Sequence, residues 1–173
     1  SSPNARHKPS PLPLVPPRGR TAAMTRIPFS ALILGLAGLI PFLWGAVTAV
    51  LPGLEDWSQS AFGFRFTSGP LLQTYGIVIL SFMSGVIWGF ATRATGATAA
   101  LGYGLSVLPA LWAFFLGTGM RPMSLWALLA GFVALLAVDA LFTRRGLAPD
   151  WWMSLRLLLT GIVAACLAIG ALA

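Results

Sequence analysis

The chain has 173 residues, of which 57% are hydrophobic and only 9% are charged, and its mean hydropathy is +0.85. Soluble domains carry about a quarter charged residues, so this composition excludes an ordinary soluble fold. The net charge of +7 is not arranged as a basic stripe between aromatic residues, and we expect no nucleic-acid binding. A single cysteine, Cys166, cannot form a disulfide within the chain. Because it is far in sequence from the single histidine, His7, we also expect no metal or cofactor site.

Residues 1–30 differ in composition from the rest of the chain. They include five basic residues, no acidic residue and seven prolines: Pro3, Pro9, Pro11, Pro13, Pro16, Pro17 and Pro28. So many prolines forbid an amphipathic targeting helix, and the segment is predicted to be a disordered tail. Met24, which comes shortly before the first apolar stretch, is a plausible natural start.

Five apolar stretches occupy residues 31–173. Each has about 20 residues, the length that a helix needs to cross roughly 30 Å of hydrocarbon. The predicted spans are 31–51, 71–92, 97–117, 123–142 and 155–173. We therefore predict an all-α fold: a polytopic transmembrane bundle of five helices, which makes membrane lipid the first partner of the chain.

The basic residues predict the orientation of the bundle. Nine of them fall in the tail and in the connections around Arg93 and Arg144, whereas the opposite side holds only Arg65 and Arg121. Lysine and arginine are enriched on the cytoplasmic side of membrane proteins. The N-terminus is therefore predicted inside, with the C-terminus outside after five crossings. The bacterial inner membrane is the expected location, and the mitochondrial inner membrane is the alternative.

Prolines and small residues within the spans suggest how the helices pack. Pro41 and Pro109 lie inside the first and third spans, where each removes a backbone hydrogen bond and should kink its helix. Small residues recur at four-residue steps, a pattern that lets membrane helices approach closely within a bundle or across subunits. The candidate packing residues are Ser81, Gly85, Gly89, Gly96, Ala100, Gly104, Gly161 and Ala165.

The connection 52–70 is apolar although it lies outside the spans. Its first half has an apolar helical face, and its second half places phenylalanines at every other residue. This pattern predicts a short interfacial helix followed by an extended piece. The candidate partner surface consists of Leu54, Trp57, Phe62, Phe64 and Phe66.

Asp139 is the only carboxylate inside a predicted span. An ionisable group within the membrane is a functional candidate by default, as a proton or cation site. Asp139 lies near the inner end of its span, however, where Arg144, Arg145 or Arg156 could neutralise it. We favour a structural ion pair. The sequence contains no other arrangement of catalytic residues, and we expect no enzymatic activity.

Several phrases of the sequence resemble an uncharacterised family of small bacterial inner-membrane proteins with mitochondrial relatives, labelled a domain of unknown function. They are Ile33-Leu34-Gly35-Leu36-Ala37-Gly38-Leu39-Ile40-Pro41-Phe42, Tyr75-Gly76-Ile77-Val78-Ile79-Leu80-Ser81-Phe82, Gly85-Val86-Ile87-Trp88-Gly89, and Trp151-Trp152 with Leu155-Arg156-Leu157 and Thr160. The resemblance covers residues 25–170 and implies five spans and a start at Met24. Family members often have a polar or basic residue just before the Trp-Gly pair. This chain has Ile87 at that position, so we expect no functional charge in this segment.

Two functions remain open from the sequence. The first is a non-catalytic accessory or assembly subunit of a larger energy-converting inner-membrane complex, suggested by the small-residue faces and the apolar connection. The alternative is a small transporter or channel that uses the kinked spans and Asp139.

Overall fold

The computed structural model describes residues 26–173, so most of the predicted tail, including Met24, lies outside the described residues. Within this range all the regular secondary structure is helical, and there is no strand. Five helical segments are long and apolar enough to cross a membrane: Phe29–Val50, Ser68–Ala91, Gly96–Gly117, Met123–Arg144 and Trp152–Leu172. The predicted all-α, five-span architecture is confirmed, and the chain is a multi-pass membrane protein.

The first span consists of two helices, α1 (Phe29–Ala37) and α2 (Ile40–Val50). The interruption lies immediately before Pro41, which has no N–H group to donate to a carbonyl one turn earlier. Within the interruption, the carbonyl oxygen of Gly38 accepts a hydrogen bond of 3.1 Å from the hydroxyl of Tyr75. A side chain from another span thus satisfies a backbone group that hydrocarbon could not satisfy.

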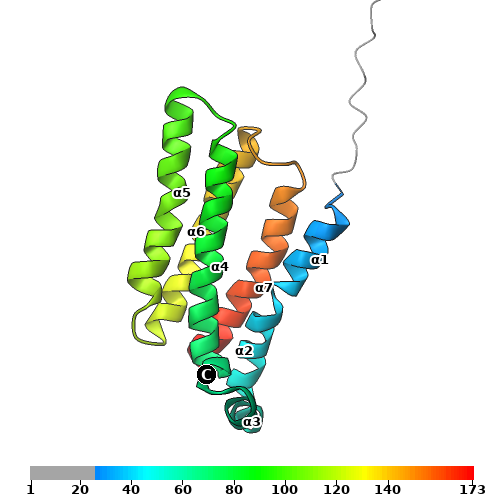
Figure 1. Ribbon diagram of the computed structural model, residues 1–173, viewed down its shortest axis with the longest axis vertical. Coiled ribbons are helices and arrows are strands. Elements are labelled where there is room, and N and C mark those ends of the chain that lie inside the picture. Colours follow the sequence, from blue (N-terminus) through cyan, green and yellow to red (C-terminus); the bar gives the residue numbers. More distant parts are fainter. Residues whose placement is uncertain (1–25) are drawn as a thin grey trace, which may run out of the picture.

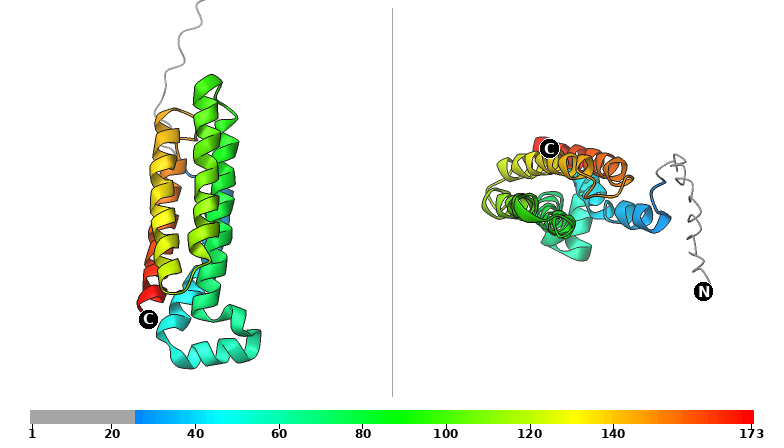
Figure 2. Two further views of the ribbon diagram at one scale, coloured as in Figure 1. Left: turned by 90° about the vertical axis from the view of Figure 1, so that its left-hand side faces the viewer. Right: turned by 90° about the horizontal axis from the view of Figure 1, so that it is seen from above.

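The connection after the first span forms α3 (Pro52–Phe62), which lies across one end of the bundle (Figure 2). The extended piece predicted after it is wrong, because Phe64–Phe66 forms a single 3-10 turn, η1. Gly63 ends α3 with φ of 89°, a value that favours glycine. The hydroxyl of Ser58 then donates to the carbonyl of Phe66 at 2.9 Å, which folds the phenylalanines back onto α3.

The remaining four spans form two antiparallel hairpins, α4 (Ser68–Ala91) with α5 (Gly96–Gly117) and α6 (Met123–Arg144) with α7 (Trp152–Leu172). Around the bundle the neighbours are α2, α4, α5, α6 and α7, and α7 returns to α2 (Figure 1). Helix α4 also contacts α6 and α7, so it is the most central span. Gly146, with φ of 68°, terminates α6.

The bundle interior is built of leucine and phenylalanine side chains that meet glycines. Leu72, Leu80 and Leu128 have no exposed surface. An added Cβ at Gly45 would lie 2.6 Å from Cγ of Leu72. Such distances show that glycines set how closely the helices approach. Helix α5 continues as one helix through its buried proline, Pro109.

Candidate functional site

Asp139 and Arg156 form an ion pair between α6 and α7. Nε of Arg156 donates to Oδ2 of Asp139 at 2.7 Å, and the two side chains are only 4% and 1% exposed. Asp139 lies five residues before the end of α6, so the pair sits within the apolar span, roughly 7 Å from that end. A lone charge at this depth would be costly, whereas the pair has no net charge.

Trp152 forms a hydrogen bond with the second oxygen of the same carboxylate. Its Nε1 donates to Oδ1 of Asp139 at 2.8 Å. Trp152 lies four residues before Arg156 on α7, so one face of this helix presents both donors to α6. The ring of Phe90 packs edge-on against Trp152, with centroids 5.1 Å apart, and holds the indole in place from α4. Asp139 therefore has a donor on each oxygen.

The other two candidate partners of Asp139 lie elsewhere. Arg144 and Arg145 are exposed at the end of α6. Of the described residues, Arg156 is the one cation within ion-pair distance of Asp139. Arg156 is buried within α7, so it does not belong to the connection between α6 and α7 where it was counted as an orientation signal.

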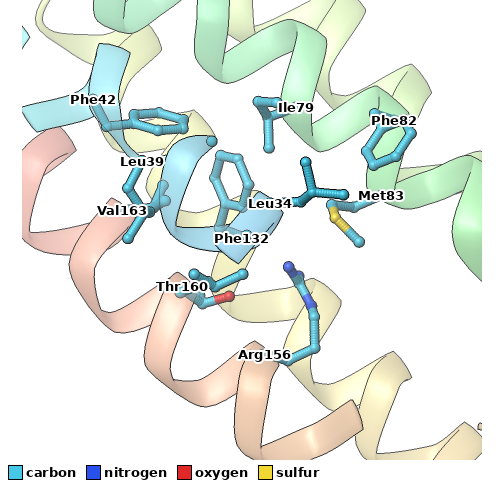
Figure 3. A pocket seen from close by; sticks show the side chains of 13 residues that line it. Leu34, Leu39, Phe42, Ile79, Phe82, Met83, Phe132, Arg156, Thr160 and Val163 are labelled. Carbon is cyan, nitrogen blue, oxygen red and sulfur yellow. The ribbon is translucent and has the colours of Figure 1, made fainter. Parts of the chain in front are cut away.

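A cavity of about 160 Å³ lies next to the ion pair. Figure 3 shows the guanidinium group of Arg156 pointing into the space between Leu34, Met83 and Phe132. Arg156 and Thr160 are the two polar side chains of its lining. Nη2 of Arg156 and Oγ1 of Thr160 are buried and have no hydrogen-bond partner. The bundle thus keeps two unused polar atoms beside an apolar cavity.

The predicted packing residues lie mainly on the outer surface of the chain. Ser81 is half-buried, and the others are exposed: Gly85, Gly89, Gly96, Ala100, Gly104, Gly161 and Ala165. An added Cβ at any of the five glycines among them would meet nothing within 4 Å. Close approach inside the chain instead occurs at Gly35, Gly45, Gly69, Gly76, Gly102, Gly117, Gly131 and Gly170. The predicted residues are therefore free to contact something outside the described chain.

The candidate partner surface is exposed, apart from Leu54, which is half-buried. The rings of Trp57, Phe62 and Phe66 follow one another with centroids 5.5 and 5.9 Å apart. All three line a groove of about 620 Å³ beside α2 and α4. Phe64 is exposed on η1 and does not line this groove.

Trp152 and Thr160 are the site residues that sequence reasoning missed. Trp151 and Trp152 stand next to the predicted fifth span, where tryptophan is typical of an interfacial aromatic belt and does not by itself indicate a buried site. The available signal for both residues was their spacing in the sequence. Trp152 lies four residues before Arg156, and Thr160 lies four residues after it. Three polar or amphipathic residues at this spacing share one face of a helix.

Replacing Trp152 with phenylalanine is expected to destabilise the protein by about 1 kcal/mol. Phenylalanine keeps the packing against Phe90 but has no N–H group for Asp139. Side-chain hydrogen bonds within membrane bundles contribute up to about 1–2 kcal/mol. Unfolding of the purified chain in mixed detergent–SDS micelles measures the loss. Trp126→Phe, at an exposed position on α6, is the control. Equal stability of the two variants would contradict the assigned hydrogen bond.

The model of a family described as "Protein of unknown function (DUF3429)" matches residues 27–172. This range covers all five spans and the ion pair between α6 and α7. No curated protein and no solved structure matches the chain.

Proposed function

The chain belongs to the DUF3429 family of proteins of unknown function, and we propose that it is a non-catalytic accessory or assembly subunit of a larger membrane complex. The observation that carries this proposal is the outward position of small residues on α4 and α7. Gly85 with Gly89, and Gly161 with Ala165, each lie four residues apart and are exposed. Each pair therefore forms a shallow strip on one helix face.

The outward glycines stabilise neither their own helices nor the packing within the chain. Glycine in a helix costs about 1 kcal/mol relative to alanine, and at Gly85 and Gly89 an alanine Cβ would meet nothing. Lipid tails pack against alanine as readily as against glycine. A helix of another protein, by contrast, gains close backbone contact at such a strip, because membrane helices associate through packing rather than hydrophobicity.

The aromatic segment of α3 and η1 supports the same function at the end of the bundle. Trp57, Phe62 and Phe64 are each more than half exposed. Aromatic residues are enriched in protein interfaces, where they contribute much of the binding energy. The segment is anchored to α2, because Nε1 of Trp44 donates to Ser58 Oγ at 3.2 Å. It therefore presents its rings from a fixed position.

The charges at the two ends support a location and an orientation for this subunit. Arg93, Arg144 and Arg145 are exposed at one end, and Arg65 and Arg121 at the other. We place the first end in the cytoplasm of a bacterium, with the protein in the inner membrane. The corresponding arrangement in a mitochondrion has this end in the matrix. An energy-converting complex is the partner proposed in either membrane.

A small transporter or channel is the alternative function. The interruption between α1 and α2 supports it, because broken helices form the substrate sites of many transporters. The arrangement around Asp139 does not favour it, since both carboxylate oxygens already accept hydrogen bonds from Trp152 and Arg156. Ion or substrate flux in liposomes containing the purified chain would favour the transporter.

The subunit proposal predicts that the native protein co-migrates with a larger complex after gentle detergent extraction. Replacing Gly85 and Gly89 together by leucine is expected to reduce the recovered partner at least tenfold, because the two side chains fill the strip. Native gel electrophoresis followed by mass spectrometry of the band measures the recovery.

The control for this experiment is Ala137→Leu, which adds similar bulk at an exposed position on α6. All variants should unfold at about the wild-type SDS fraction, since none of the changes touches the bundle interior. A wild-type protein that elutes as a monodisperse monomer would count decisively against the proposal. Unchanged partner recovery by the double variant would exclude the α4 strip as the contact.

A further inference from the structure

The cavity beside Arg156 is enclosed by helices from both halves of the chain. Its walls come from α1, α2, α4, α6 and α7 and include the rings of Phe42, Phe82 and Phe132. Leu34 on α1 and Phe82 on α4 line the cavity and are 72% and 64% exposed. From the exposure of these two lining residues, we infer that the cavity opens sideways between α1 and α4, toward the lipid.

Two buried polar atoms at this cavity lack a partner. Leaving such an atom without a hydrogen bond in an apolar surrounding is unfavourable, and native proteins rarely do so. Both Nη2 of Arg156 and the hydroxyl of Thr160 can donate. They lie on the same face of α7, one turn apart. A molecule with a hydrogen-bond-accepting oxygen would provide both donors with an acceptor.

The ion pair decides which charge this molecule can have. Asp139 already neutralises Arg156, so a bound anion would leave one negative charge buried within the span. A bound cation would be repelled by the positively charged guanidinium group. An uncharged molecule causes neither a buried net charge nor this repulsion. The apolar and aromatic walls likewise favour a lipophilic molecule.

Size and shape favour a ring at the polar end. Cavities of about 150 Å³ in protein interiors accept a benzene molecule, and this cavity has about 160 Å³. Three aromatic rings line it, which suits edge and face contacts to another ring. A tail attached to such a ring can leave through the opening between Leu34 and Phe82.

We propose that this cavity binds a quinone, an uncharged lipophilic ring whose carbonyl oxygen accepts hydrogen bonds from Arg156 and Thr160. The ring lies between Phe42, Phe82 and Phe132, and the tail extends into the bilayer between α1 and α4. The proposal concerns binding and no redox step. The ester carbonyl of a glycerolipid offers the same acceptor atom without a ring. This site is independent of the protein contacts proposed above, because neither the α4 strip of Gly85 and Gly89 nor the rings of α3 and η1 line the cavity.

Titration of the purified full-length chain with decyl-ubiquinone tests the proposal, with bound quinone measured after size-exclusion chromatography. We expect saturable binding of about one molecule per chain. Thr160→Val keeps the side-chain shape but removes the hydroxyl, and is expected to weaken binding roughly tenfold. Thr48→Val is the matched control, because the Thr48 hydroxyl is equally buried but already bonded to the carbonyl of Trp44 at 2.9 Å.

A second pair of variants keeps the test decisive if Thr160→Val does not fold. Leu34→Trp narrows the opening from an exposed position and should also reduce quinone binding at least tenfold. Leu36→Trp lies on the same helix, is exposed and does not line the cavity, so it should leave binding unchanged. Absence of saturable quinone binding, or equal binding by all variants, would overturn the proposal.

A parallel titration with dioleoylglycerol distinguishes the two sources of a carbonyl oxygen. A preference for decyl-ubiquinone, with no displacement by excess dioleoylglycerol, supports the ring. Binding of dioleoylglycerol together with failure of decyl-ubiquinone would assign the cavity to a lipid ester and overturn the quinone proposal. Recovery of the chain as part of a complex has no bearing on either result, so failure of the subunit proposal and failure of this one are separate observations.

Discussion

Arg156→Met is expected to destabilise the protein by about 3–5 kcal/mol. Methionine fills a similar volume but leaves the carboxylate of Asp139 buried with the indole N–H of Trp152 as its remaining donor. A buried charge that has lost its partner is far more costly than the intact pair is favourable. The loss is measured as the shift in the SDS fraction that unfolds the purified chain.

A double-mutant cycle shows whether the loss comes from the ion pair. Asp139→Asn removes the charge but keeps an oxygen that can accept from Trp152. We expect the double variant Asp139→Asn with Arg156→Met to be more stable than Arg156→Met alone, because no unpaired charge remains. Arg145→Met, at an exposed position on the same end of the bundle, should change stability little. Additive effects of the two single substitutions would contradict the pairing.

Gly131→Ala is expected to cost about 1–3 kcal/mol, although alanine is the better helix former. Its Cβ would lie 2.7 Å from Cδ2 of Leu80 and 2.9 Å from Cδ1 of Trp112. Neither neighbour can yield easily. Leu80 has no exposed surface, and Nε1 of Trp112 is tied to the carbonyl of Ala127 at 2.7 Å. The substitution therefore forces α4, α5 and α6 apart.

Gly85→Ala provides the comparison on an outward face. Nothing lies within 4 Å of an added Cβ there, so this variant should be neutral or slightly more stable than the wild type. Both variants are compared by unfolding in mixed detergent–SDS micelles. If Gly131→Ala proves as stable as Gly85→Ala, the α4–α6 contact described here is wrong.

The five spans could be predicted because length and hydrophobicity suffice to identify a membrane helix. The boundaries were less certain. The fifth span was predicted from residue 155, whereas α7 begins at Trp152, whose indole is buried and donates to Asp139 on α6. The segment after Gly63 was misread because alternating phenylalanines are typical of a strand, while the hydrogen bond from Ser58 to Phe66 has no sequence signature.

Which face of each span packs inside the bundle could not be predicted. In a soluble helix, polar residues mark the outer face, but lipid-facing and buried faces of a membrane helix are equally apolar. Gly85 and Gly131 therefore look alike in the sequence, although the first is exposed and the second is buried. Repeated small residues indicate close approach of some helix without indicating which one.

The sequence predicted an ion pair of Asp139 with one of three arginines, but it did not show which of the three is the partner. Arg144 and Arg145 are nearer to Asp139 in the sequence than Arg156 is. Arg144 is the last residue of α6 and Arg145 follows it, however, and both are exposed. Arg156 is the partner because the chain reverses at Gly146, so that α7 packs antiparallel to α6. This arrangement cannot be predicted from sequence spacing alone.

The closed order of the spans has a consequence for biosynthesis. The α4–α5 and α6–α7 hairpins join neighbours in sequence, so each can form as soon as it enters the bilayer. The contact between α2 and α7, by contrast, joins the first span to the last. Until α7 has been inserted, one side of α2 faces lipid or a chaperone, and the ring of helices is completed only when synthesis of the fifth span is finished.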